Sequence, residues 1–253
     1  MGIRTRSIVL GLLLTAGAVN SAVADTSRLP VEHVKRDMVT PKGTLQIHGG
    51  PDWPLRSGQL SFLAHDGPNR GRLNAGASFG VMDKLDVGLV MPMAFAPDLD
   101  AHSPTLFGTY SFSKQADYEV GAFGALMLPI EGDVALHAGL PVMLNSGGAF
   151  RIDTGVFLSF YTAGANRVDL EVPLTVPIQT TRWAYVGPEV AIRLEGIDDR
   201  MRVPLGVFGG FTLDPNDQLL GDIEAHFRFP HAGSAFDAFE ILVSANLYFD
   251  LGG

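Results

Sequence analysis

The sequence predicts an all-β protein, a transmembrane up-and-down antiparallel β-barrel of about 12 strands. Long segments alternate apolar and polar residues, and between Phe239 and Phe249 every odd position is apolar. Because successive side chains of a strand point to opposite faces, such a segment has one face suited to lipid and one suited to water. These segments exceed the roughly five or six residues of a typical globular strand and fit a tilted crossing of a bilayer.

A secretory leader is the second indication. Arg4 and Arg6 form a basic start, residues 8–19 are apolar apart from Gly and Thr, and Ala22-Val23-Ala24 is a small-residue cleavage site. The apolar stretch is too short for an uncleaved membrane anchor, and polar residues follow it at once. The sequence therefore predicts a signal peptide over residues 1–24, cleavage after Ala24, and export across the inner membrane of a Gram-negative bacterium to its outer membrane.

Composition restricts the function classes. The mature chain would keep 16 Lys and Arg against 27 Asp and Glu, a net charge of about −11, which argues against a nucleic-acid partner. The absence of cysteine excludes disulfides, thiolate metal sites and a cysteine nucleophile. An exported chain with 46% hydrophobic residues and 30 Gly either buries its apolar surface in a two-layer β core or exposes it to lipid.

Six strands are expected in the first part of the mature chain. In one of them Leu85, Val87 and Leu89 share a face, and Asp86 lies on the other. Turn-forming residues at 82–84 and 113–117 separate neighbouring strands. The six strands cover residues 71–82, 85–96, 103–113, 117–129, 134–145 and 148–161.

Five more strands follow, and the clearest sets Ile223, Ala225 and Phe227 against a charged face. They cover residues 166–178, 182–195, 201–213, 218–229 and 236–250. A soluble β-sandwich would produce the same alternation, because its polar face would be solvated. The length of the strands and the short turns between them favour the barrel meander instead.

An even number of strands requires a twelfth upstream, since single-chain bacterial barrels close with even numbers and both termini would then lie in the periplasm. Residues 43–50 and 57–64 compete for that place, each apolar at alternate positions. The barrel domain is accordingly expected over residues 43–253. The polar residues 25–42 before it are expected to form a periplasmic lead-in, with a partial plug as the alternative.

Two segments resemble a known group of barrels. Residues 40–50 contain a Pro-x-Gly entry strand, and Gly80-Val81-Met82-Asp83-Lys84-Leu85-Asp86-Val87-Gly88 forms a hairpin motif. Together they resemble porin-like outer-membrane barrels of proteobacteria, in particular those grouped with the phenol meta-degradation pathway. The resemblance favours residues 43–50 as the first strand and implies hydrophobic or aromatic solutes. Such barrels often end on an aromatic residue that the assembly machinery reads, whereas here residues 250–253 follow Phe249.

Chemistry-bearing motifs are scarce. The seven histidines form no metal-ligand pair, no Gly-x-Ser-x-Gly occurs, and His137 and His226 have no serine at a local spacing. The sequence therefore predicts no catalytic residue, metal or cofactor, and no enzyme. A lipid-modifying barrel enzyme is the weakest alternative, because such enzymes assemble their sites from neighbouring strands.

Charged residues opposite the apolar faces are the candidate functional residues, since they would face the barrel lumen. They are Glu119, Arg151, Asp153, Asp169, Glu171, Glu189, Arg193, Asp222, Glu224, His226, Arg228 and Glu240. One interpretation is a channel or facilitator for small solutes with charged walls. The other is a closed structural or ligand-binding barrel with a salt-bridged lumen, because twelve strands lie between filled and open barrels. The expected partners are outer-membrane lipid, the barrel assembly machinery and a small-molecule solute.

Overall fold

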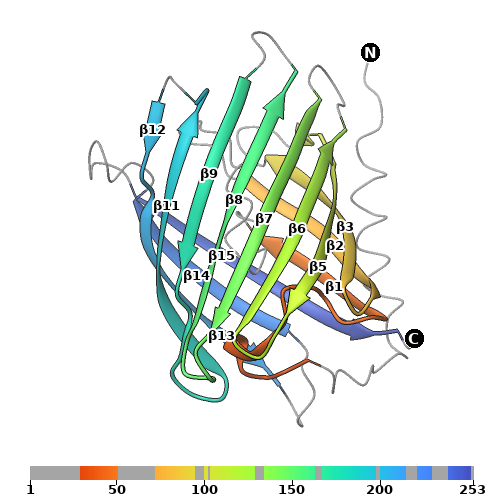
Figure 1. The fold of residues 1–253 in the computed structure, drawn as a ribbon, viewed down its shortest axis with the longest axis vertical. Coiled ribbons are helices and arrows are strands. Elements are labelled where there is room, and N and C mark those ends of the chain that lie inside the picture. The colour runs from red at the N-terminus through yellow and green to blue at the C-terminus, as the bar shows by residue number, and fades with distance from the viewer. Residues whose placement is uncertain are drawn as a thin grey trace.

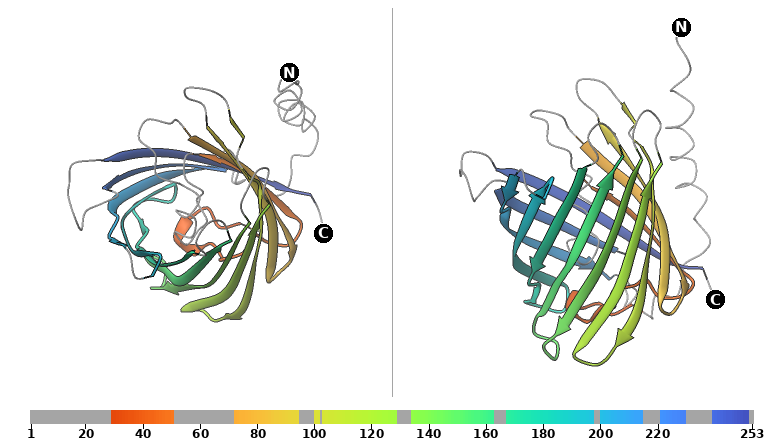
Figure 2. Two further views of the ribbon diagram at one scale, coloured as in Figure 1. Left: turned by 90° about the horizontal axis from the view of Figure 1, so that it is seen from above. Right: turned by 45° about the horizontal axis from the view of Figure 1, so that its top comes forward.

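The chain forms a closed antiparallel β-barrel of twelve wall strands in a computed structural model (Figures 1 and 2). The structure describes residues 29–50, 72–94, 100–101, 103–128, 134–162, 167–197, 200–214, 221–229 and 239–251. The expected signal peptide at 1–24 and the alternative first strand at 57–64 lie outside the described residues.

The wall strands are β1 (Thr44–Gly50), β2 (Arg72–Met82), β3 (Leu85–Ala94), β5 (Thr105–Lys114), β6 (Tyr118–Met127), β7 (Ala135–Asn145), β8 (Arg151–Tyr161), β9 (Arg167–Thr175), β11 (Ala184–Glu195), β13 (Leu205–Leu213), β14 (Gly221–Phe229) and β15 (Glu240–Asp250). Three short strands extend this wall: β4 (Asp100–Ala101) pairs with β3, while β10 (Ile178–Gln179) and β12 (Arg200–Arg202) pair with β11. The predicted all-β barrel of about 12 strands is therefore confirmed.

Closure is made by the first and last strands. β1 pairs with β2 on one side and with β15 on the other, with Thr44 opposite Asp250. Every neighbouring pair is antiparallel, and the ring continues through β9 and β11. Residues 44–50 thus supply the first wall strand, which leaves no open sheet edge along the seam.

Proline interrupts two of the expected strands. The strand predicted over 166–178 ends at Thr175 and resumes at Ile178, after Pro177. The strand predicted over 201–213 is divided into β12 and β13 at residues 203–204. Since proline has no N–H to give to the ladder, the wall continues past Pro204 through its carbonyl, which accepts a bond from the Ala191 N–H at 3.0 Å.

The two faces of the wall are inverted relative to a soluble protein. Along β8 the side chains of Arg151, Asp153 and Ser159 are buried, whereas Val156 and Phe160 on the opposite face are 49% and 41% exposed. The apolar face is therefore on the outside of the barrel, so the β-sandwich alternative is wrong. Among the described residues, no helix has the length and apolar character needed to span a bilayer.

Residues 29–40, here called the N-terminal segment, lie inside the ring of strands (Figure 2, left view). The segment contains a single turn of 3-10 helix, η1 (His33–Lys35). Leu29, Val34, Met38 and Val39 are all buried. The part of the expected lead-in that the structure describes is therefore packed within the barrel.

Candidate functional site in the barrel lumen

Arg36 fixes the N-terminal segment to the wall through a fully buried guanidinium. Its two terminal nitrogens donate to the carboxylate of Asp222 at 2.5 and 2.8 Å, and one also donates to the hydroxyl of Thr212 at 3.0 Å. Asp222 accepts a further hydrogen bond from the Tyr248 hydroxyl at 2.8 Å. Such a bidentate, charge-assisted pair is among the stronger polar interactions in proteins.

The charge of Arg36 is retained despite its burial. Desolvation is the largest single effect and lowers the pKa of Arg36, but the charge and hydrogen bonds of Asp222, together with Tyr248 and Tyr185, raise it by more, so the pKa of Arg36 lies above its usual value. A buried ion pair of this kind is costly to break from one side, because the remaining charge is left without its partner.

Arg151, on β8, holds the same segment from another part of the wall. It donates to the backbone carbonyls of His33 and Arg36 at 2.9 and 3.2 Å, and to the carboxylate of Asp153 at 2.7 Å. The ring of His33 in turn stacks on Tyr185, with centroids 4.0 Å apart. The wall therefore grips both the backbone and the side chains of the segment.

The segment leaves the lumen in an extended form. Glu119 accepts a hydrogen bond from the backbone N–H of Met38, and Asp86 accepts one from that of Thr40, both at 2.9 Å. Together with Arg36, these contacts fall on every second residue, as in a strand. Carboxylates from β3, β6 and β14 thus bind successive alternate positions of the segment.

A second charged group belongs to the wall alone and is here called the charged side. Its members are Glu171, Glu189, Arg193, Glu224, His226 and Arg228, from β9, β11 and β14. His226 lies between two carboxylates, with Nδ1 3.0 Å from Glu189 and Nε2 2.9 Å from Glu224. Two ionised carboxylates are satisfied together only when both ring nitrogens carry protons.

The remaining members of the charged side complete the pairing. Arg228 donates to Glu189 at 2.9 Å, Arg193 lies 3.1 Å from Glu171, and the Tyr185 hydroxyl donates to Glu224 at 2.9 Å. A cavity of about 30 Å³ lies between the two Arg–Glu pairs. This volume is enough for a bound water molecule.

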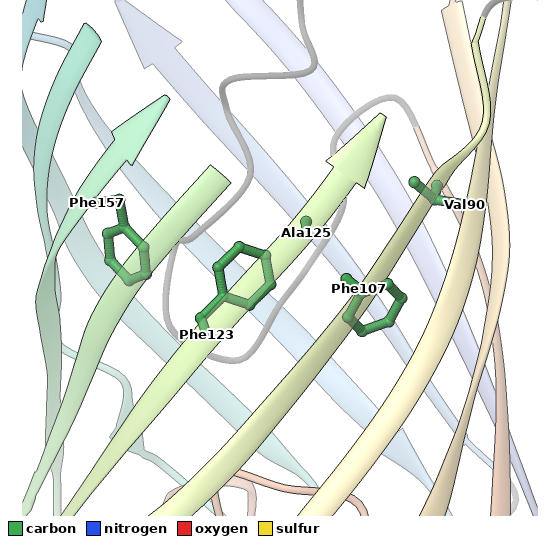
Figure 3. Packing of buried hydrophobic residues seen from close by; sticks show 5 residues of the cluster. All are labelled: Val90, Phe107, Phe123, Ala125 and Phe157. Atoms are coloured by element: carbon green, nitrogen blue, oxygen red, sulfur yellow. The ribbon is translucent and has the colours of Figure 1, made fainter. Parts of the chain in front are cut away.

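The wall across β3 to β8 instead carries an apolar cluster, here called the aromatic side. It consists of Val90, Phe107, Phe123, Ala125 and Phe157 (Figure 3). Phe123 lies 6.5 Å from Phe107 and 6.2 Å from Phe157 between ring centroids. Gly88 and Gly139 leave space for these rings, because a Cβ atom on either would collide with Phe107 or Phe157.

His137 has a serine partner that local spacing does not reveal. Its Nδ1 lies 2.8 Å from the hydroxyl of Ser159, directly opposite on β8, and Asp169 is opposite Ser159 on β9. Asp169 binds Arg167 and the Gly196 N–H, and Ser159 is completely buried. The three residues therefore lie in a row without the order or access that a Ser-His-Asp nucleophile needs.

The predicted lumen residues fall into three groups. Glu119, Arg151 and Asp222 contact the N-terminal segment, and Asp153 pairs with Arg151 behind it. Glu171, Glu189, Arg193, Glu224, His226 and Arg228 form the charged side, and Asp169 stands apart with Arg167. The side chain of Glu240 lies outside what the structure describes. Among the described residues, no three His, Asp or Glu side chains are placed to hold a metal ion.

Sequence reasoning missed several members of these groups. Arg36 and His33 lie in a segment without periodicity, so no pattern assigned their side chains to the lumen. Tyr185, Thr212 and Tyr248 have the correct strand phase but are uncharged. The phase of the alternation alone would have found these three wall residues.

No protein-family model matches the chain, and no curated protein matches its sequence. Among solved structures, it is similar to a bacterial polysaccharide outer membrane secretin, at 12% identity over 84% of this chain and 99% of the other, with a TM-score of 0.46. The translocator domain of autotransporter NalP from Neisseria meningitidis has 8% identity, coverage of 81% and 86%, and a TM-score of 0.44. OmpT, an outer membrane protein of Vibrio cholerae, has 9% identity, coverage of 82% and 96%, and a TM-score of 0.35. Similarities at this level do not identify a function for the chain.

Proposed function

We propose that this protein is an outer-membrane facilitator for small solutes whose lumen is closed by the N-terminal segment. The observation that carries the proposal is the polar attachment of the segment: Asp86, Glu119, Arg151 and Asp222 hold it through hydrogen bonds and ion pairs. When the segment moves, water can form hydrogen bonds with the polar wall groups that it releases. An apolar interface would instead expose apolar surface to water, which is unfavourable. A wall of this kind suits a barrel with a closed and an open form.

The apolar outer face supports the membrane location. Phe211, Val207 and Ile241 are 65%, 53% and 66% exposed, which a protein in water would avoid over so large a surface. With the signal peptide expected at residues 1–24, we propose insertion into the outer membrane of a Gram-negative bacterium by the barrel assembly machinery.

Hydrophobic or aromatic solutes are the proposed cargo. The resemblance to the phenol meta-degradation barrels implies them, and the rings of Phe107, Phe123 and Phe157 supply an apolar strip inside an otherwise polar lumen. No catalytic residue is part of this proposal.

Planar-bilayer recording tests the facilitator. The wild-type protein should conduct rarely, and a variant lacking residues 29–40 should conduct at least about tenfold more often, because removing the segment hydrates the carboxylates that hold it. Arg36→Ala provides a milder version of the same change. Both variants must first show the heat-dependent shift in gel migration of a closed barrel. Silence of both correctly folded variants would overturn the facilitator.

A closed structural or ligand-binding barrel is the second candidate, favoured by the burial of the inner face. Arg151, Ser159 and Glu171 are at most 1% exposed, as in a filled lumen. This candidate predicts that the same variants stay silent and unfold more readily than the wild type, since buried charges lose their partners.

A further inference from the structure

The wall around Arg36 is built as a receptor for a planar cation. Thr212, Asp222 and Tyr248 come from the neighbouring strands β13, β14 and β15, and Thr212 lies directly opposite Asp222. Asp222 faces the two terminal nitrogens of Arg36 with one oxygen each. The ring of Tyr248 lies beside the guanidinium, 5.6 Å from its carbon to the ring centroid.

Every edge of the guanidinium meets an acceptor. Its Nε donates to the carbonyl of Pro30 at 3.0 Å, and a terminal nitrogen reaches the carbonyl of Val31 at 3.3 Å. On the wall, Thr212 and Asp222 accept hydrogen bonds from the other N–H groups of Arg36. A round ammonium ion has three donors and no fixed plane, so it matches only part of this arrangement.

The segment itself offers a contrast between its two neighbouring basic residues. Lys35 has a side chain that is 51% exposed and pairs with Glu32 at the surface of the segment. Arg36, the next residue, enters the wall and is fully buried. The wall pocket is thus filled by the guanidinium group of Arg36 and not by the equally charged ammonium group of Lys35.

We propose that Thr212, Asp222 and Tyr248 form a guanidinium-binding subsite of the lumen, and that Arg36 occupies it as a tethered ligand. This inference rests on the proposed function for its consequence: a solute that carries a guanidinium group competes with Arg36 and frees the segment. A tethered group acts at an effective concentration in the millimolar range, so free ligands must exceed that range to displace it.

Chemical rescue tests the subsite without any need for conduction. In Arg36→Ala, added methylguanidinium should raise the temperature of the heat-dependent gel shift toward that of the wild type. Methylammonium, which has the same charge, should require at least about a tenfold higher concentration, because it lacks the planar fork. The double variant Arg36→Ala/Asp222→Asn should lose the difference between the two cations. Equal effects of both cations, or no effect of either, would overturn the subsite.

Two further measurements cover a variant that folds poorly. If Arg36→Ala gives little closed barrel, the refolding yield with and without methylguanidinium replaces the gel-shift temperature, with the same expected order of cations. Arg36→Lys, which keeps the charge, should unfold at a lower temperature than the wild type. A wild-type shift temperature for Arg36→Lys would contradict a site that selects the planar group.

Bilayer recording then separates this inference from the proposed function. In the wild type, methylguanidinium should increase opening at about a tenfold lower concentration than methylammonium. Rescue in a protein that never conducts would uphold the subsite and overturn the facilitator. Conduction that responds equally to both cations, with no rescue, would overturn the subsite alone.

Discussion

The charged side and the aromatic side of the lumen fill the same barrel by different means. On the charged side, Glu189 serves both His226 and Arg228, so each group depends on the others. On the aromatic side, Phe157 lies over Gly139 on the adjacent strand, and the contact depends on shape alone. Charge pairing fails as a unit when one member is removed, whereas ring packing is lost in proportion to the misfit.

Glu189→Gln should have the largest effect on stability, because it breaks the charged side at its most connected residue. Arg228 and His226 are each only 14% exposed, and both would lose the ionised Glu189; His226 would keep Glu224 alone. The free energy of unfolding in urea should fall by about 3–5 kcal/mol. Glu32→Gln is the matched control, since the pair of Glu32 with Lys35 is exposed and should cost less than about 0.5 kcal/mol. Equal losses in the two variants would mean that the charged side is not cooperative.

Ile223→Arg tests whether the outer face of the wall meets lipid, in contrast with the charged and aromatic sides of the lumen. Ile223 is 46% exposed between the inward-facing Asp222 and Glu224, so an arginine there should meet lipid. The expected loss is about 2–4 kcal/mol, measured by unfolding from lipid vesicles. Ile223→Phe keeps an apolar side chain and should fold like the wild type. A tolerated arginine would place this outer face in water.

Gly139→Ala should disturb the aromatic side by a smaller amount. The added methyl would collide with the ring of Phe157, which must then shift along the wall, at a cost of about 1–3 kcal/mol. Gly124→Ala on the neighbouring strand is the matched control, because nothing lies within 4 Å of its added Cβ. Equal stability of the two variants would show that the ring of Phe157 does not need a glycine at position 139.

Asp222→Asn should cost the barrel least, about 1–2 kcal/mol, because in the proposed open form the segment withdraws and Arg36 is not left buried without its partner. Release of the segment is measured by thiol labelling, since the natural chain has no cysteine. A cysteine placed at the buried Val34 should react about tenfold faster in the Asp222→Asn background. A cysteine at the exposed Lys35 should react equally fast in both backgrounds. A loss as large as that of Glu189→Gln, without faster labelling, would show that the segment is a fixed part of the core.

The strands and their inward faces could be predicted because the alternation of apolar and polar residues is visible in the sequence of each strand. The charged inward faces of β8 and β14 could be read from residues 151–161 and 221–229 without knowledge of their neighbours. Contacts between strands could not be predicted in this way, because they depend on how neighbouring strands are aligned. The pairing of His137 with Ser159 depends on the register of a hairpin, and that register depends on the conformation of the loop at 146–150. Tyr248 has the inward phase of its strand but is a residue type common at membrane interfaces, and its burial and its hydrogen bond to Asp222 place it in the lumen.

The position of Arg36 also has a consequence for how the barrel is assembled. Arg36 precedes β1, whereas its partners Thr212, Asp222 and Tyr248 belong to the last three strands, so the pair joins residues 186 positions apart. Closing this long loop has an entropic cost, which arises once, when β1 docks on β15. Forming the ion pair afterwards adds little to that entropic cost. A seam slipped by two residues would displace the segment by about 7 Å along β15 and carry the guanidinium out of reach of Asp222. The buried pair therefore stabilises one register of the seam, because Arg36 reaches Asp222 only when β15 has paired with β1 in that register.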